Sequence, residues 1–324
     1  MLELADKIIK GHRLTREEDV TAFLTADLKE LCEGANKLRE HFHGNKADLC
    51  AIINGRSGSC SEDCKFCAQS GHHNTGIAEY GFLTREVILE DCKKHEAEGV
   101  HRYSIVTAGR SLSGTDLDQA IAAYQVMKEE CNINLCASHG LLTEEAYMDL
   151  KAAGVSRYHE NIETSKRNFP NICTTHTYED KIEGIRLAKK AGLEVCSGGI
   201  IGMGETWEDR LDMAFSLSEL KVDSIPINAL MPIKGTPLED NIRVTEEELL
   251  RTIAIFRYIN PEADIRLAAG RAIMDNSGEK AFLSGANATI TGNMLTTSGN
   301  NIKQDIKMLE TLGFDLSKQH EETK

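Results

Sequence analysis

The stretch ADLCAIINGRSGSCSEDCKFC, residues 47–67, decides how the rest of the chain is interpreted. Its first part, residues 47–54, is a short run rich in apolar side chains, which is typical of a buried strand. A glycine-bearing loop follows, in which Cys60, Cys64 and Cys67 stand at C-x3-C-x2-C spacing. The stretch therefore predicts a strand that leads directly into a loop carrying three thiols.

Similar strand-like runs alternate with amphipathic helical runs over most of the chain. The strand candidates are residues 47–54, 101–108, 132–138, 155–163, 193–201, 222–230, 263–269 and 286–292. The helix candidates are residues 84–98, 115–130, 143–153, 177–191, 206–220 and 245–259. Thr143 and Thr245 stand where N-caps are expected, and Gly99, Gly154 and Gly192 stand where helices should end.

About eight strands, each followed by a helix, are typical of a (β/α)8 barrel of the TIM type, although a doubly wound open sheet shares the alternation. We expect an α/β protein with this barrel over residues 46–295. An N-terminal helical extension over 1–45 should precede it, and a C-terminal helix and charged tail over 296–324 should follow.

Polar and sulfur-bearing side chains recur at alternate positions of the strand candidates, although parallel strands are usually apolar on both faces. These positions are Arg102 and Ser104; Cys136 and Ser138; His159, Asn161 and Glu163; Ser224 and Asn228; with Cys50, Cys196 and Arg266 in mid-strand. Because buried polar groups need partners, the pattern favours a barrel whose interior holds a ligand. The alternative is that these side chains face solvent or the outer helices.

Composition excludes several classes of protein. The 324 residues carry 37 basic and 51 acidic side chains, a formal net charge of −14. This balance disfavours a nucleic-acid or anionic-membrane surface, and no apolar run reaches the roughly 20 residues that span a bilayer. The charged N-terminus lacks a signal-peptide core. We therefore expect a cytoplasmic protein, in which clustered cysteines are more often metal ligands or catalytic groups than disulfides.

The three thiols of the loop can bind three corners of a four-iron cluster and leave one iron for another ligand. A zinc site completed by His72 or His73 is the alternative, but closed zinc sites usually combine two CxxC halves. With Phe66 before the third cysteine, the loop resembles the C-x3-C-x-aromatic-C signature of the radical S-adenosylmethionine enzymes.

That resemblance implies a [4Fe-4S] cluster bound by Cys60, Cys64 and Cys67. In the family, the open iron binds the amino and carboxylate groups of S-adenosylmethionine. An electron from the cluster then cleaves the sulfonium and releases a 5′-deoxyadenosyl radical.

Further segments between about residues 45 and 313 resemble the biotin synthase family. They are CSEDCKFCAQS (60–70), YHENIETS (158–165), VCSGGIIGMGE (195–205), SIPIN (224–228), KGTP (234–237) and IRLAAGR (265–271). The resemblance implies insertion of sulfur between two unactivated carbons of dethiobiotin, with a second iron–sulfur cluster in the barrel as the sulfur donor. It also implies a flavodoxin- or ferredoxin-type electron donor and a homodimer.

The resemblance also assigns individual residues. By position, Asn161 and Asn228 would bind the ureido ring of the substrate, and Glu163 would bind the ribose hydroxyls of S-adenosylmethionine. The other residues implied to bind this cofactor are Phe66, Gly199, Gly202 and Glu205. Each asparagine could instead be a bulge or edge residue, and Glu163 could lie at the surface.

One position departs from the family pattern. Better-known biotin synthases hold a [2Fe-2S] cluster with cysteines from strands two, three and five and an arginine. Cys136, Cys196 and Arg266 match, but Ser104 stands at the strand-two position, and a serine oxygen is a poor replacement for a thiolate on iron. We hypothesise that Cys50 replaces it, so that Cys50, Cys136 and Cys196 bind an auxiliary cluster of [4Fe-4S] or [4Fe-5S] type. The alternative is that Cys50 is a small buried apolar residue.

Three other functions stay open: a hydrogenase maturase-like radical enzyme, an iron–sulfur electron carrier, and a zinc-containing barrel hydrolase. A carrier would expose a fully ligated cluster and would need no polar barrel interior. The remaining cysteines, Cys32, Cys92, Cys131 and Cys173, are interpreted as structural or incidental.

Overall fold

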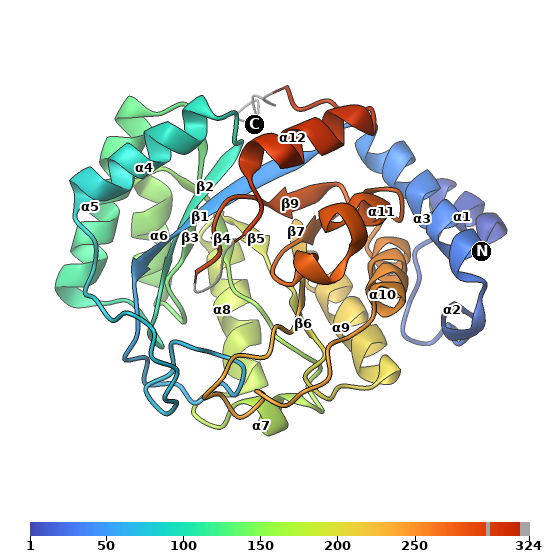
Figure 1. Ribbon diagram of the computed structural model, residues 1–324, viewed down its shortest axis with the longest axis horizontal. Helices are drawn as coiled ribbons and strands as arrows, with labels where there is room; N and C mark the ends of the chain where they lie inside the picture. Colours follow the sequence, from blue (N-terminus) through green and yellow to red (C-terminus); the bar gives the residue numbers. More distant parts are fainter. Residues whose placement is uncertain (296–298, 318–324) are drawn as a thin grey trace.

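Parallel strands close into a ring at the centre of the molecule (Figure 1). The computed structural model describes residues 1–295 and 299–317, and there the strand order is β5-β4-β3-β2-β1-β9-β8-β7-β6, with β5 also pairing with β7. The strands are β1 (Asp48–Arg56), β2 (Arg102–Thr107), β3 (Asn134–Ser138), β4 (Val155–His159), β5 (Glu194–Cys196), β6 (Gly199–Ile201), β7 (Ser224–Ala229), β8 (Asp264–Leu267) and β9 (Ala288–Ile290). Because β5 and β6 share one place in the ring, the expected (β/α)8 TIM-type barrel is confirmed.

Helices surround the ring, as expected from their apolar faces. Those that alternate with the strands are α4 (Arg85–Ala97), α5 (Gly114–Glu130), α6 (Glu144–Ala152), α8 (Tyr178–Lys190), α9 (Trp207–Glu219) and α10 (Glu246–Ile259). Short helical turns interrupt the loops at α7 (Phe169–Ile172), η1 (Arg271–Ile273), η2 (Asp275–Ser277) and α11 (Glu279–Phe282). The Thr143 and Thr245 side chains cap α6 and α10 as predicted, by accepting hydrogen bonds from Ala146 N and Glu248 N.

Helices also occupy both ends of the chain. The N-terminal helices are α1 (Leu2–Ile9), α2 (Ala22–Thr25) and α3 (Leu28–His43), and α12 (Ile302–Thr311) lies near the C-terminus. Helix α3 packs against α10 outside the ring. The Asp315 backbone accepts a hydrogen bond from Ala47 N and donates one to Asn45 O, so the last described segment pairs beside the start of β1. The predicted charged tail at 318–324 lies outside the described residues, as do residues 296–298.

No helix within the described ranges has both the length and the apolar character needed to cross a membrane.

Several strands are shorter than predicted, and for two neighbouring ones, those predicted at 155–163 and 193–201, the structure shows the reason. Strand β4 ends at His159 instead of continuing to residue 163, and Glu163 has a φ of 64°, outside the strand region. The predicted strand 193–201 is divided into β5 and β6 at Ser197 and Gly198. A side-chain carbon at Gly198 would lie 2.0 Å from Pro226 O, so the chain passes β7 where only glycine fits.

Asp209 links α9 to the loop that follows β4. Its carboxylate accepts hydrogen bonds from Ser165 Oγ at 2.6 Å, from Thr206 N at 2.8 Å and from Arg167. Burial opposes ionisation, but these hydrogen bonds prevail and lower the pKa of Asp209 from 3.8 to about 2. The carboxylate therefore stabilises the fold above pH 4, and this contribution is lost as pH falls from about 4 towards 2.

We expect Asp209→Asn to lower the free energy of unfolding at pH 7 by about 2 kcal/mol, since a pKa difference of one corresponds to about 1.4 kcal/mol. Urea unfolding of the metal-free full-length chain, followed by circular dichroism at several pH values, measures this. The variant should also lose less stability than the wild type between pH 5 and pH 3. An identical pH dependence in the two proteins would contradict the assignment.

Candidate functional site

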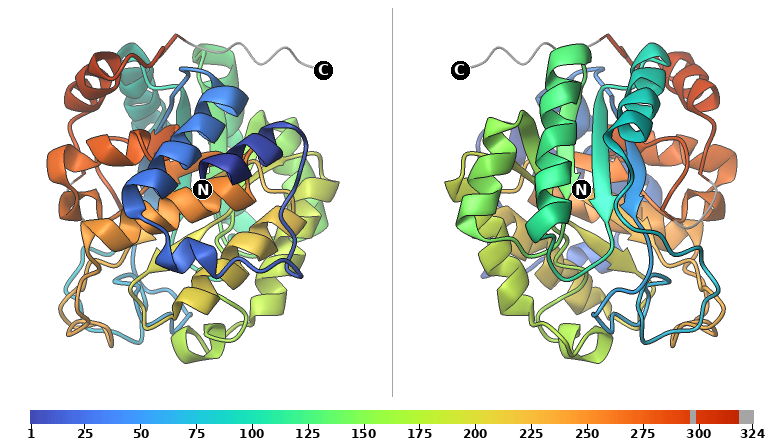
Figure 2. Two further views of the ribbon diagram at one scale, coloured as in Figure 1. Left: turned by 90° about the vertical axis from the view of Figure 1, so that its right-hand side faces the viewer. Right: turned by 90° about the vertical axis from the view of Figure 1, so that its left-hand side faces the viewer.

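The site lies at the carboxyl end of the ring, where the loops after β1, β4 and β7 gather at the lower end of both views in Figure 2. The cysteine loop is closed by backbone hydrogen bonds from Cys60 N to Gln69 O, from Gly71 N to Cys60 O and from Cys67 N to Cys64 O. These bonds hold the three thiols on one turn of chain.

Two of the loop thiols, those of Cys64 and Cys67, have raised pKa values. Burial raises the pKa of Cys67 to about 11, and the nearby charges of Cys60 and Glu163 add to the effect. A hydrogen bond with Cys173 and burial raise the pKa of Cys64, and the nearby charges of Cys67 and Glu163 raise it further. Metal binding must therefore release protons from this loop. Three neighbouring thiols on one loop fit three corners of a four-iron cluster. The Glu163 carboxylate lies near enough for its charge to raise the pKa values of Cys64 and Cys67.

The carboxyl end of β4 is joined to β6 through Asn161 and Glu163. Asn161 Oδ1 accepts from Gly198 N at 2.9 Å, and Asn161 Nδ2 donates to Glu163 Oε2 at 3.2 Å. The Glu163 backbone pairs with Gly198 O and Ile200 N, which explains its left-handed φ. A side-chain carbon at Gly199 would lie 2.4 Å from Glu163 O, so glycine is required there. Burial raises the pKa of Glu163.

The glycine turn after β6 is held from within by Glu205. Its carboxylate accepts from Gly202 N at 2.8 Å and from Met203 N at 2.7 Å, and it pairs with Arg210. Gly202 has a φ of 104°, which favours glycine. Glu205 therefore shapes the turn instead of presenting its carboxylate to solvent. Phe66 packs beside this turn in a small apolar cluster with Ile172, Met203 and Leu230, to which Ile200 and Leu238 also belong.

Asn228 on β7 is also tied to backbone. Its Nδ2 donates to Gly199 O at 3.1 Å, and its Oδ1 accepts from Ala269 N at 3.0 Å. Asn161 and Asn228 therefore both border Gly198 and Gly199, although the sequence could not predict these bonds. Each amide nitrogen retains one more hydrogen for a ligand.

Lower in the ring, two of the three strand thiols are in contact. Cys50, Cys136 and Cys196 are buried on β1, β3 and β5. A hydrogen bond between the Cys50 and Cys136 thiols raises the pKa of Cys50 and lowers that of Cys136 to about 7, with help from Arg102 and Arg157. Since β2 lies between β1 and β3, this contact crosses the interior.

Cys196 and Ser104 lie in the same layer, and the structure shows no hydrogen bond between either side chain and Cys50 in the part of the chain that it describes. Burial raises the pKa of Cys196, against the charges of Arg266 and Arg157. Ser104 is buried on β2 and is the register partner of Cys136.

Buried ion pairs surround these thiols and also cross the ring. Asp48 on β1 accepts from Arg266 on β8 at 2.5 Å and from Arg102 on β2 at 3.0 Å. Arg157 on β4 pairs with Glu194 on β5 at 2.8 Å and with Asp264 on β8 at 3.4 Å. The polar positions of the strands therefore point inward, as the alternation predicted. The arginines place positive charge beside the thiols, which suits an anionic thiolate-bound cluster.

Asp48→Asn should destabilise the protein by about 3 kcal/mol, because it leaves the buried guanidinium groups of Arg102 and Arg266 without their shared carboxylate. Urea unfolding at pH 7 measures the change. Asp212→Asn is the matched control, since Asp212 pairs with Arg16 where both side chains are more than a third exposed, and should cost less than about 1 kcal/mol. Equal effects of the two substitutions would contradict this interpretation.

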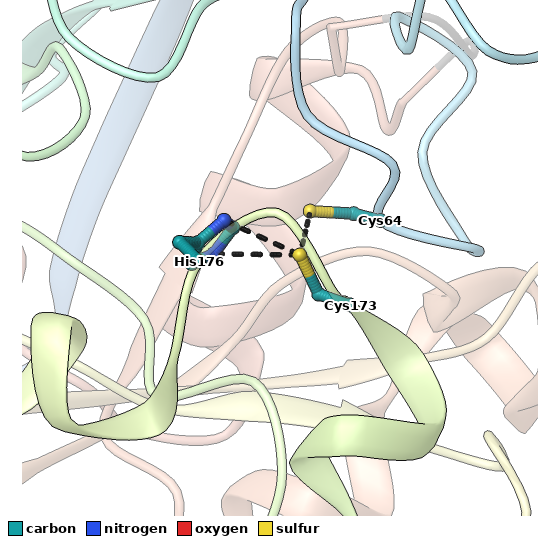
Figure 3. A group of neighbouring side chains, drawn as sticks. All are labelled: Cys64, Cys173 and His176. Atoms are coloured by element: carbon teal, nitrogen blue, oxygen red, sulfur yellow. Dashed lines mark hydrogen bonds between the residues drawn. The ribbon is translucent and has the colours of Figure 1, made fainter.

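Cys173, which the sequence indicates is structural or incidental, lies against the cysteine loop. Cys173 Sγ lies 3.7 Å from Cys64 Sγ and 3.2 Å from His176 Nδ1, and His176 Nδ1 lies 2.6 Å from Glu62 Oε2 (Figure 3). Hydrogen bonds with Cys64 and His176 lower the pKa of Cys173 to about 4, although burial opposes them. The C-x2-H spacing of Cys173 and His176 was the signal that could have pointed here.

His72 and His73, the two histidines of the zinc alternative, are not in the group formed by Cys64, Cys173 and His176. His72 Nε2 lies 3.0 Å from Ser61 O, and His73 Nδ1 lies 3.0 Å from Cys67 O. Both rings therefore hydrogen-bond the backbone of the cysteine loop.

Two known protein families match different parts of the chain. Residues 54–217 match the radical SAM superfamily, and residues 226–315 match the Biotin and Thiamin Synthesis associated domain. A biotin synthase of Alkaliphilus metalliredigens is 67% identical over 314 residues, which cover 97% of this chain and 99% of the relative. A biotin synthase of Clostridium beijerinckii is 66% identical over 316 residues, which cover 98% of this chain and 100% of the relative.

Solved structures share the fold at low sequence identity. A methylornithine synthase superposes with a TM-score of 0.84 at 23% identity and covers 96% of both chains. A maturase of the [FeFe]-hydrogenase superposes with a TM-score of 0.81 at 17% identity, over 97% of this chain and 74% of the maturase. These two likenesses concern the barrel and its helices.

Proposed function

Because the chain belongs to the biotin synthase family of radical S-adenosylmethionine enzymes, we propose that it inserts sulfur between two unactivated carbons of dethiobiotin to form biotin. It is an enzyme of biotin synthesis, and its family uses a [4Fe-4S] cluster and S-adenosylmethionine. The hydrogenase maturase alternative has less support, since the maturase structure is only 17% identical. An electron carrier has none from these relatives, which are named as enzymes.

The observation that carries the proposal is the presence of two sets of three thiols at different depths of one barrel. Cys60, Cys64 and Cys67 stand on the loop at the carboxyl end, and a second set stands on alternate strands below. When bound, the upper cluster supplies the electron that cleaves S-adenosylmethionine, and the lower cluster supplies sulfur. Asn161 and Asn228, which hydrogen-bond the adjacent residues Gly198 and Gly199, would bind the substrate between the two clusters.

The residues around the upper thiols have separate tasks. We assign Glu163 to the ribose hydroxyls, since its charge acts on the Cys67 thiol and its carboxylate keeps one oxygen outside the bond to Asn161. Gly199 and Gly202 keep the backbone free of side chains near the adenosine, and Phe66 offers an apolar surface beside them. Glu205 acts indirectly, by holding the turn through two backbone amides.

We assign the auxiliary cluster to Cys50, Cys136 and Cys196, as a [4Fe-4S] or [4Fe-5S] cluster in preference to [2Fe-2S]. The contact between Cys50 and Cys136 supports this set, and so does the short polar side chain of Ser104 at the remaining position. Arg266 keeps a place beside the cluster, although its three nitrogens all donate to protein oxygens here. Its charge therefore balances the thiolates whether or not a nitrogen also binds iron.

The family also suggests where the protein works and with which partners. We propose a cytoplasmic homodimer that receives electrons from a flavodoxin- or ferredoxin-type protein. Ten cysteines that are all free thiols suit a reducing compartment. A net charge of −14 gives no support to nucleic acid as a partner.

The test is anaerobic reconstitution of the full-length protein, counting of iron and sulfide, and incubation with dethiobiotin, S-adenosylmethionine and a reductant. We expect both 5′-deoxyadenosine and biotin. Formation of 5′-deoxyadenosine without biotin would overturn the substrate assignment, and absence of both products would overturn the proposal as a whole.

A further inference from the structure

A second group of metal-ligand side chains lies against the cysteine loop, outside both proposed clusters. The ligand atoms of Cys64, Cys173 and His176 all lie within 4.8 Å of one another, and Figure 3 shows the Cys173 sulfur between the other two side chains. Cys173 and His176 are buried, with 3% and 7% of their surface exposed. No residue of this group other than Cys64 is needed for the proposed reaction.

The distances match a tetrahedral site. Zinc–sulfur bonds of about 2.3 Å place two thiolates on one ion about 3.8 Å apart. The Cys64 and Cys173 sulfurs are 3.7 Å apart, and His176 Nε2 lies 3.8 Å from Cys173 Sγ. The two sulfurs and a ring nitrogen therefore lie close enough to share one ion, with a fourth position open. Nδ1, at 3.2 Å, is the nitrogen nearer to Cys173 Sγ, so the side chains must shift before Nε2 can bind the ion.

The histidine has the partner that a metal-bound imidazole usually has. His176 Nδ1 lies 2.6 Å from Glu62 Oε2, which also accepts from Thr175 Oγ1 at 2.8 Å. A proton on Nδ1 directed at the carboxylate leaves the Nε2 lone pair for the ion, which is the common carboxylate–histidine–metal arrangement. Arg110 also approaches Glu62, at 3.5 Å, so the carboxylate carries a full negative charge into this network.

The two loops are fastened together before any ion binds. Asp63 accepts from Thr174 N at 2.8 Å and from Thr175 N at 3.2 Å, and Lys65 N donates to Ile172 O at 3.0 Å. These bonds join residues on either side of Cys64 to residues on either side of Cys173. A site held in this way needs little ordering when the ion arrives.

We propose that Cys64, Cys173 and His176 bind a single divalent first-row ion, ferrous iron or zinc, on protein that has not yet received its four-iron cluster. Two thiolates and an imidazole suit both ions. Because Cys64 is also a proposed cluster ligand, the ion must leave or move when the cluster is built. That competition rests on the proposed function, whereas binding of the single ion does not.

Cobalt titration tests the binding. The background variant Cys60→Ser with Cys67→Ser keeps Cys64 but removes the other two loop thiols, and the strand thiols are the same in every sample. Metal-free full-length protein titrated anaerobically with Co²⁺ should bind one ion with tetrahedral absorption and thiolate charge-transfer bands.

Further substitutions in this background locate the ion. Cys173→Ser should remove one bound Co²⁺ per chain, and His176→Gln, which changes the site without removing a thiol, should also lose the spectrum. Glu62→Gln should weaken binding by about 10- to 100-fold, as expected for a carboxylate that orients a metal-bound imidazole. Cys131→Ser, in a thiol at the end of α5, is the matched control and should change nothing. Unchanged stoichiometry and spectrum in both Cys173→Ser and His176→Gln would overturn the proposal.

Zinc competition tests the exchange. Wild-type apo-protein loaded with one equivalent of Zn²⁺ should gain iron and cluster absorption more slowly than the unloaded protein, and Cys173→Ser should show no such delay. A delay of the same size in Cys173→Ser would overturn the exchange. Cobalt binding together with absence of 5′-deoxyadenosine in the assay above would instead count against the proposed function alone.

Discussion

Cys67→Ala is expected to reduce the formation of both 5′-deoxyadenosine and biotin by at least about 10³-fold, equivalent to about 4 kcal/mol in transition-state free energy. Its thiol is one of three on the loop, and a cluster with two protein ligands is not retained. Anaerobic iron counting should show a loss of roughly four iron atoms per chain, as for one four-iron cluster. Product analysis by liquid chromatography measures both compounds.

The control for this prediction is Cys32→Ser, which removes a free thiol from α3, outside the ring. It should retain its iron and both products. Substantial formation of 5′-deoxyadenosine by Cys67→Ala would contradict the assignment of the loop.

Cys50→Ala is expected to separate the two reactions. Biotin formation should fall by at least about 10³-fold, while cleavage of S-adenosylmethionine to 5′-deoxyadenosine continues at the upper cluster. The reason is that Cys50 on β1 contacts Cys136 on β3, so it stands among the strand thiols and not among those of the cysteine loop. Iron should fall from roughly eight to roughly four atoms per chain if both clusters contain four irons.

Two further variants serve as a parallel test and a control for Cys50→Ala. Cys136→Ala should behave like Cys50→Ala, because both would remove one ligand of the same cluster. Ser104→Ala should keep the second cluster and biotin formation, because its hydroxyl is a weak ligand beside three thiolates. Full retention of the second cluster in Cys50→Ala would show that Cys50 is not a ligand.

The barrel was predictable because its signals are local and repeated. Strand and helix periodicities, threonine caps and glycines at helix ends each involve a few neighbouring residues. The inward direction of the polar strand positions was also predictable, since alternation along a strand assigns faces. The breaks in β4 and between β5 and β6 were not, because they arise where Glu163 pairs with β6 and Gly198 passes Pro226.

The site was predictable in its residue types and less so in its contacts. The bonds that Asn161, Asn228 and Glu205 make to backbone amides and carbonyls could not be predicted, because they depend on how separate segments approach one another. Cys173 was missed because its contact with Cys64 spans 109 residues of chain. Such long-range pairs follow from the folded geometry and have no periodic pattern in sequence.

The ring closes between its first and last strands, and this order has a consequence for synthesis. β1 pairs with β9, with Asp48 opposite Ala288, a separation of 288 − 48 = 240 residues. At roughly 5 to 20 residues per second, about 12 to 48 s pass between translation of these two strands. Throughout that interval the nascent chain has an unsatisfied edge on β1, exactly where the hydrogen-bonding partner is missing. Protection of this edge by chaperones would therefore matter most until β9 has been made, when about a tenth of the polypeptide remains to be translated.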